Sequence, residues 1–179
     1  MNRREALVTL SALLGGTVFG AQRLLADVVN PATAGRALTA AQLAYLNEVA
    51  ETIVPTTPGS PGAKAAGVAA FMQEIVRDFY DEKEFATFTT GPERLEEASR
   101  AMFSSRGYLD LLPGERFTLL MSLEKAQPQP DYYKMIKQLA VWGYFSSEIG
   151  MTQALAHVAV PGRYEADVTI GPRTKAWSQ

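Results

Sequence analysis

The stretch that decides the fold is "TIVPTTPGSPGAKAAGVAAFM", residues 52–72, in which a loop rich in proline and glycine separates two apolar segments. Pro55, Pro58 and Pro61 each lack a backbone N–H and fix φ, so neither a helix nor a central strand can run through this loop. Two interpretations are open: the loop either binds a phosphate group or forms a stiff connection that docks against another surface.

The phosphate interpretation requires a specific pattern. A P-loop has G-x-x-x-x-G-K-[ST] after a strand, so that backbone N–H groups and the lysine converge on the phosphates. Here Gly59 and Gly62 are too close together, and Lys64 is followed by alanine. A helical pattern, not a strand, precedes the loop. The sequence therefore favours a stiffened turn that presents a preordered surface.

Helical periodicity flanks the loop on both sides. Before it, Thr39 and Gln42 form a capping-box pattern, and apolar residues recur at helical spacing until Pro55 ends the run. After it, apolar residues from Val68 to Phe79 trace one face of a second helix, which is expected to end near residues 80–84.

Three further helices are predicted. One covers residues 92–105 with Leu95, Ala98, Met102 and Phe103 pointing inward. The next lies within residues 111–127, begins near a proline, and has an apolar face that includes Phe117. The last opens at residue 131 and is expected to be broken at residue 150 by a glycine.

No segment shows a convincing period-two alternation, and no internal repeat is visible. The predicted fold is therefore all-α, an irregular bundle of about five helices. Closely spaced Pro161, Gly162, Gly171 and Pro172 predict an extended C-terminal arm over residues 161–179. The helical domain is expected over residues 38–160, after a linker at 27–37.

The first 26 residues resemble an export signal. Arg3 and Arg4 form a basic pair, and residues 6–21 are uncharged and apolar. That segment is shorter than the roughly 20 residues that span a membrane, and the arginine pair resembles a twin-arginine signal for folded proteins. Small residues at 21 and 26 lack a clear cleavage pattern, so removal and retention as an anchor that contacts the membrane both stay open. An ordinary amphipathic first helix is the alternative.

Composition excludes several classes of function. The formal net charge is −2, and no basic face for nucleic acid is evident. Cysteine is absent, which removes disulfides, thiolate zinc sites, iron–sulfur clusters and covalent c-type haem. The single histidine, His157, leaves no multi-histidine metal site within the chain. We expect no cofactor and no metal in this chain.

The sequence gives little evidence for a catalytic group. A lone histidine on a short apolar segment more often packs or caps a helix than catalyses a reaction. Adjacent acids such as Glu96 and Glu97 point apart on a helix and usually solvate it. A nucleophile with a positioned histidine base is not suggested either.

Aromatic residues gather in "LAVWGYFSSEIGMTQAL", residues 139–155. Trp142, Tyr144 and Phe145 exceed what one face of a helix can bury. Either the excess fills the core, or it anchors a partner that covers it, and the sequence favours the partner.

Three motifs together resemble the gluconate 2-dehydrogenase subunit 3 family. They are "AETIVPTTPGSPGAKAAGVAAFM" (50–72), "WGYFSSEIGMTQAL" (142–155), and "VPGRYEADV" (160–168) followed by a Gly-Pro pair and Trp177. The resemblance runs from about Leu38 to the C-terminus. Its most specific parts are the Ile-Val-Pro loop and the Gly-Tyr-Phe-x-Ser-x-x-Gly turn.

The resemblance implies a non-catalytic small subunit of a periplasmic sugar or sugar-acid dehydrogenase. In such complexes a large subunit of the glucose–methanol–choline type holds FAD, and a cytochrome c or another acceptor takes the electrons. The small subunit would support folding, stability and twin-arginine co-export of the flavoprotein. A stand-alone enzyme and a stand-alone periplasmic helical binding module are the alternatives. The residues expected to contact the partner are Ile53, Pro55, Pro58, Pro61, Lys64, Trp142, Tyr144, Phe145, Glu148, Gly150, Tyr164 and Trp177.

Overall fold

The computed structural model describes residues 36–158, 160, 162, 167, 169–171 and 174–178. The chain divides into two compact units, Met1–Ala37 and Leu38–Gln179, and every element described here belongs to the second. The export signal with Arg3 and Arg4, the membrane contact at residues 6–21, and most of the linker lie outside the described residues.

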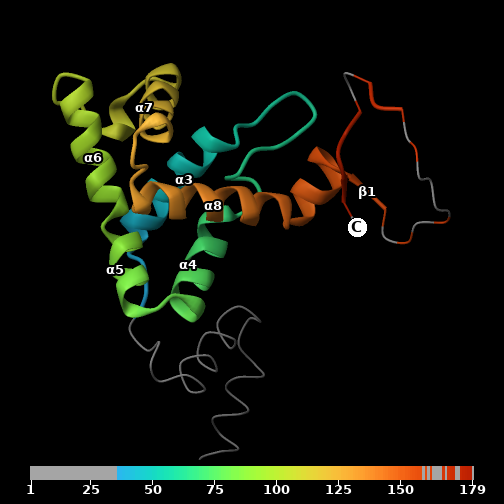
Figure 1. The fold of residues 1–179 in the computed structure, drawn as a ribbon, viewed down its shortest axis with the longest axis horizontal. Helices are drawn as coiled ribbons and strands as arrows, with labels where there is room; N and C mark the ends of the chain where they lie inside the picture. The colour runs from blue at the N-terminus through green and yellow to red at the C-terminus, as the bar shows by residue number, and fades with distance from the viewer. Residues whose placement is uncertain are drawn as a thin grey trace, which may run out of the picture. The chain divides into compact units, whose positions relative to one another are not determined.

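The described residues are mostly helical, which confirms the predicted all-α class (Figure 1). The helices are α3 (Ala40–Ile53), α4 (Val68–Phe79), α5 (Glu82–Thr89), α6 (Gly91–Met102), α7 (Pro113–Lys125) and α8 (Asp131–Phe145). Between and after them lie a 3-10 turn η2 (Tyr108–Asp110), a π-helical turn η3 (Gly150–Ala154), and two short strands, β1 (Ala156–His157) and β2 (Trp177–Ser178).

Helix α8 is the centre of this unit, because it packs against α3, α4, α5, α6 and α7 (Figure 1). Its buried face repeats at helical spacing through Ile136, Leu139, Ala140, Gly143 and Tyr144. Gly143 brings α4 close, since a Cβ there would approach the Phe71 ring to 2.5 Å. The core is therefore built on one continuous stripe of α8.

The first predicted helix is confirmed as α3, together with its capping box. Thr39 Oγ1 accepts a hydrogen bond from the N–H of Gln42 at 3.2 Å, and Gln42 Oε1 accepts one from the N–H of Thr39 at 2.9 Å. The pair satisfies two backbone donors at the start of the helix. Leu46, Val49 and Ala50 form its buried face.

The sequence-based prediction missed α5. Its eight residues begin within "YDEKE", residues 80–84, where the acids suggest a solvated helix end. Asp81 and Glu84 instead form a reciprocal capping box, with Asp81 Oδ1 accepting from the N–H of Glu84 at 2.7 Å. Two carboxylates in that turn also favour a helix N-terminus electrostatically. Phe88 of this short helix is fully buried, and Phe85 packs against the core beside it.

Three apolar side chains expected on inward faces are exposed. The exposed fraction is 75% for Phe79, 46% for Met102 and 57% for Phe117. Phe79 and Met102 end their helices, and α6 stops at Met102 because Ser104 and Ser105 take positive φ angles of 50° and 65°. Phe117 lies within α7, where Leu119 and Leu120 are the buried residues. Periodicity therefore predicted the helices but not which of their apolar side chains the core buries.

The chain after α8 differs from the expected break at Gly150. The helix ends at Phe145, and Gly150 opens the π-helical turn η3. Strand β1 then pairs in parallel with β2, joining Ala156 to Trp177 and His157 to Ser178. The described residues of 161–179 contain no helix. In the part of the chain that is described, no helix is long and apolar enough to cross a membrane.

Candidate partner-binding surface

The proline loop, residues 54–67, has a tight turn at its tip. Thr57 and Ser60 exchange two backbone hydrogen bonds, with N···O distances of 2.9 and 3.0 Å. Pro58 and Gly59 occupy the two central positions, and the φ angle of Gly59 is +87°. Proline followed by a residue with positive φ is typical of a type II turn, and glycine adopts that φ without strain. The sequence therefore specifies this tip locally.

Glu51 closes the neck of the proline loop. Its carboxylate accepts hydrogen bonds from the N–H of Thr56 at 2.9 Å, from Thr56 Oγ1 at 2.7 Å, and from the N–H of Lys64 at 2.9 Å. A Cβ at Gly62 would lie 2.5 Å from the same carboxylate and 2.6 Å from the Thr56 nitrogen. Burial acts most strongly and by itself raises the pKa of Glu51, but these hydrogen bonds together outweigh it and lower the pKa.

Tyr144 fastens the proline loop to α8. The Tyr144 ring is buried, and its hydroxyl donates to the carbonyl oxygen of Pro61 at 2.7 Å. The same hydroxyl lies 2.8 Å from Ser60 Oγ, so one phenol holds two residues that are more than 80 positions away in the chain. The loop is thus fixed both at its neck and near its tip.

These contacts answer the question of phosphate binding. The N–H groups of Thr56 and Lys64 donate to Glu51, and that of Gly62 donates to Thr56 Oγ1 at 3.0 Å. The N–H of Ala63 donates to the carbonyl of Val54. A carboxylate therefore already occupies the position where a P-loop would hold an anion, and the loop is a preordered connection.

Lys64 belongs to a charged network on the same side of α3. Its ammonium group forms an ion pair with Glu48, and Glu48 also pairs with Arg116 at 2.8 Å. The guanidinium of Arg116 donates to the carbonyl of Leu109 at 2.7 Å and lies over the Tyr108 ring. The Lys64 hydrogen bond is the largest factor that lowers the pKa of Glu48. This network links the proline loop to α3, η2 and α7.

Two aromatic side chains on α8 are exposed. Trp142 is 55% exposed and Phe145 is 40% exposed. The Trp142 ring meets Phe71 of α4 edge to face, with centroids 5.2 Å apart, and Phe145 packs on Tyr144 at 5.1 Å. We call Trp142 and Phe145 the aromatic surface. Each ring is held on one side by the fold and is open on the other.

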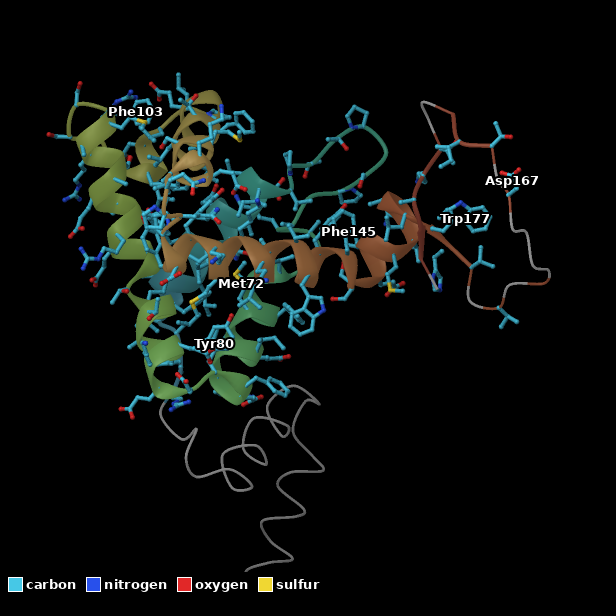
Figure 2. All side chains as sticks on the ribbon, in the orientation of Figure 1. Met72, Tyr80, Phe103, Phe145, Asp167 and Trp177 are labelled. Carbon is cyan, nitrogen blue, oxygen red and sulfur yellow. The ribbon has the colours of Figure 1, made fainter. Side chains whose placement is uncertain are left out.

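The remaining predicted contact residues are divided between surface and interior. Pro55, Pro58, Lys64 and Glu148 are exposed, whereas Ile53 and Pro61 are half-buried. Tyr144 and Gly150 lie inside the unit, so they support the surface and do not form it. Trp177, 62% exposed, pairs through its backbone with Ala156. Tyr164 lies outside the described residues. Figure 2 shows Phe145 near the end of α8 and Trp177 on the neighbouring arm.

Sequence reasoning missed Glu51, although the sequence carries a signal for it. A carboxylate in the last turn of a helix is unfavourable next to the negative end of the helix dipole. Glu51 lies in that turn of α3, directly before a loop with several backbone donors. An acid in this position therefore indicates a compensating contact.

Replacing Glu51 with glutamine is expected to lower the free energy of unfolding by about 1–2 kcal/mol at pH 7, because hydrogen bonds to a half-buried charge are lost. Because folding lowers the pKa of Glu51, the ionised carboxylate stabilises the fold fully at pH values above its ordinary pKa of about 4.5. This contribution to the free energy of unfolding is lost as the pH falls through the lower pKa of the folded state. Urea unfolding at several pH values measures this. The difference from the wild type should shrink below pH 4.5, and Glu74→Gln, on the exposed side of α4, should change little. A difference that persists unchanged into acid would contradict the role of the charge.

Comparison with known proteins decides the family. The model of the family described as gluconate 2-dehydrogenase subunit 3 matches residues 40–162, most of the chain. The chain belongs to this family. The match covers α3 to η3 and the proline loop, and the resemblance found in the sequence motifs is confirmed. No curated protein and no solved structure matched the chain.

Membership in the gluconate 2-dehydrogenase subunit 3 family makes this chain a small subunit of the kind that associates with a larger dehydrogenase complex. Among the described residues, no group of three or more histidine, cysteine, aspartate or glutamate side chains is arranged to hold a metal ion. His157 lies on β1 with an exposed side chain. The most developed surface features are therefore the proline loop and the aromatic surface.

Proposed function

We propose that this protein is the accessory subunit of a periplasmic sugar or sugar-acid dehydrogenase, and that it has no catalytic centre of its own. Its partner is a flavoprotein of the glucose–methanol–choline type that holds FAD and oxidises the sugar. A cytochrome c or another acceptor takes the electrons onward. The accessory subunit stabilises the flavoprotein and carries it across the membrane by the twin-arginine route.

The observation that carries this proposal is the aromatic surface on the central helix. Trp142 and Phe145 lie three positions apart on α8, and a partner that covers both rings would gain roughly 2–3 kcal/mol for each aromatic side chain that it buries fully. Aromatic side chains of this kind are enriched at the energetic centres of protein interfaces. The family match supports the choice of a dehydrogenase as the partner.

The proline loop supports the same proposal through its rigidity. A docking segment that is already ordered loses little conformational entropy when it binds. Glu51 and Tyr144 hold this loop with hydrogen bonds of 2.7–2.9 Å, while Pro55 and Pro58 remain exposed. The loop therefore has the properties of a preformed contact for the flavoprotein.

Assigning FAD to the partner comes from the family resemblance, and the composition of the chain is compatible with it. The sequence has no cysteine and one histidine, which leaves few residues for redox ligation. A folded-export signal on such a chain has a purpose if a flavoprotein travels with it, because FAD is loaded before export. Arg3, Arg4 and the apolar residues 6–21 are the sequence features behind this part of the proposal.

Replacing both Arg3 and Arg4 with lysine is expected to leave the flavoprotein in the cytoplasm when the two subunits are expressed together. The change keeps the positive charge but removes the arginine pair that the export machinery recognises. Dehydrogenase activity and flavin absorbance in the periplasmic fraction should fall at least about tenfold, with total flavoprotein unchanged. Arg23→Lys is the matched control, because it alters an arginine beyond the apolar segment.

Two results would overturn the proposal. If the wild-type subunit, expressed without a flavoprotein, oxidises a sugar with an added electron acceptor, it is an enzyme by itself. If the flavoprotein reaches the periplasm equally well without this subunit and never co-purifies with it, the chain is a stand-alone binding module.

A further inference from the structure

A groove lies where the N-terminal half of α3 meets the start of α6 and the turn η2. Its volume is about 440 Å³, within the range of sites that enclose small ligands or side chains. Ala41, Tyr45, Pro92 and Leu109 supply its apolar lining. Neither lysine nor arginine lines it.

All the charged groups that line the groove are carboxylates, namely Glu93, Glu96 and Asp110. Two of them converge on Gly107: a Cβ there would overlap Glu96 Oε1 and lie 3.2 Å from Asp110 Oδ2. Glycine at this position makes room for the Glu96 carboxylate to lie against the backbone, next to that of Asp110. A basic or bulky residue would fill that space.

The fold holds Glu96 in place, where it also forms an ion pair with Arg100, and the positive charge of Arg106 acts on Asp110. Glu96 accepts hydrogen bonds from the N–H of Tyr108 at 2.9 Å and from Arg100 at 3.1 Å. Tyr45 donates to it at 3.4 Å. Within the described residues, Glu93 and Asp110 form no ion pair. The groove therefore concentrates negative charge beside an apolar wall.

This combination selects a cation with a long apolar stem. Arginine places its methylene groups along apolar surface and presents several donors in a plane to neighbouring carboxylates, and it stacks on aromatic rings. Ala41, Pro92 and Leu109 match the stem, Tyr45 matches the guanidinium plane, and Asp110 with Glu96 matches its donors. A lysine would pair with the carboxylates but has no planar group to stack on the Tyr45 ring.

We propose that this groove receives an arginine side chain of the larger dehydrogenase subunit, and this inference rests on the proposed function. Charge complementarity selects a cationic guest, and the proposed function names the chain that supplies it. Helix α3 has 14 residues and is about 20 Å long. The groove lies at its beginning and the proline loop follows its end, so the partner contacts both ends of one helix.

The test measures the affinity of the purified subunit for its flavoprotein by calorimetry at low and high salt. Replacing Glu93 with glutamine and Asp110 with asparagine should raise Kd at least about tenfold at 50 mM salt. The dependence of Kd on salt should also become weaker. Glu96 is left unchanged because it supports the backbone of Tyr108. The matched control is Glu82→Gln with Asp131→Asn, which makes the same change of charge in the first turns of α5 and α8 and should leave Kd unchanged.

Each outcome decides the point. If the wild-type complex forms but the groove variant keeps the wild-type Kd and salt dependence, the groove does not bind the arginine and this inference is wrong. The proposed function is unaffected by that result. A wild-type subunit that binds no flavoprotein overturns both. If the variant changes only self-association, measured by sedimentation, the guest is a second copy and the proposal falls. Should the double variant unfold, Glu93→Gln alone, at an exposed position, is expected to raise Kd about threefold.

Discussion

Replacing Trp142 and Phe145 together with alanine is expected to weaken binding of the flavoprotein at least about 100-fold, which corresponds to about 2.8 kcal/mol. Aromatic side chains at the centre of an interface each contribute about 2 kcal/mol or more when truncated. Both rings are held in place by neighbours, Trp142 by Phe71 and Phe145 by Tyr144, so little entropy is lost when a partner covers them. Kd from calorimetry, and flavin absorbance in material pulled down through this subunit, measure the effect.

The fold should survive this double substitution, because both side chains are substantially exposed. The loss of the edge-to-face contact between Trp142 and Phe71 is expected to cost about 0.5–1.5 kcal/mol in unfolding free energy. Phe117→Ala is the matched control: it removes a ring of similar exposure from α7. Equal losses of affinity in the control and the double variant would show that the effect is not specific to the aromatic surface, and no loss in either would show that the partner binds elsewhere.

The sequence predicted the helices where local chemistry determines them. Thr39 with Gln42 and Pro55 set the ends of α3, and the predicted start of the last helix at Asp131 is also confirmed. The same logic should have found α5, since Asp81 and Glu84 repeat the capping-box pattern. Acids that cap a helix start and acids that solvate a helix end look alike in sequence, and the two apolar residues of this short helix at helical spacing, Phe85 and Phe88, were too few to identify it.

Helical spacing alone could have shown which aromatic residues of the stretch 139–155 are buried and which are exposed. Positions 136, 139, 140, 143 and 144 repeat at helical intervals on one face of α8, which places Tyr144 inside and leaves Trp142 and Phe145 outside. What spacing cannot give is the contact of the Tyr144 hydroxyl with Pro61, because that pairing depends on how α8 crosses the loop. The convergence of Glu96 and Asp110 at Gly107 is likewise a product of tertiary packing.

Replacing Gly150 with alanine is expected to lower the free energy of unfolding by about 3 kcal/mol or more and the Tm by about 10 °C. A Cβ at this position would overlap the carbonyl oxygen of Tyr144 and lie 2.8 Å from its carbonyl carbon and 3.1 Å from Phe145 Cα. These are backbone atoms at the end of α8. The same carbonyl accepts hydrogen bonds from Ser147 Oγ at 2.7 Å and from its N–H at 3.1 Å, so relief of the overlap breaks contacts that form the turn.

Gly114→Ala, in the first turn of α7, is the control for this substitution. A Cβ at Gly114 meets no heavy atom within 4 Å, and alanine has the higher helix propensity, so this variant should be neutral or up to about 1 kcal/mol more stable. Thermal unfolding followed by circular dichroism compares the two. Because Tyr144 also holds the proline loop, Gly150→Ala should weaken flavoprotein binding even below its Tm, whereas Gly114→Ala should not. A Gly150→Ala protein with wild-type Tm would mean that the turn after α8 is free to shift, and that the loop and the aromatic surface are not held as one unit.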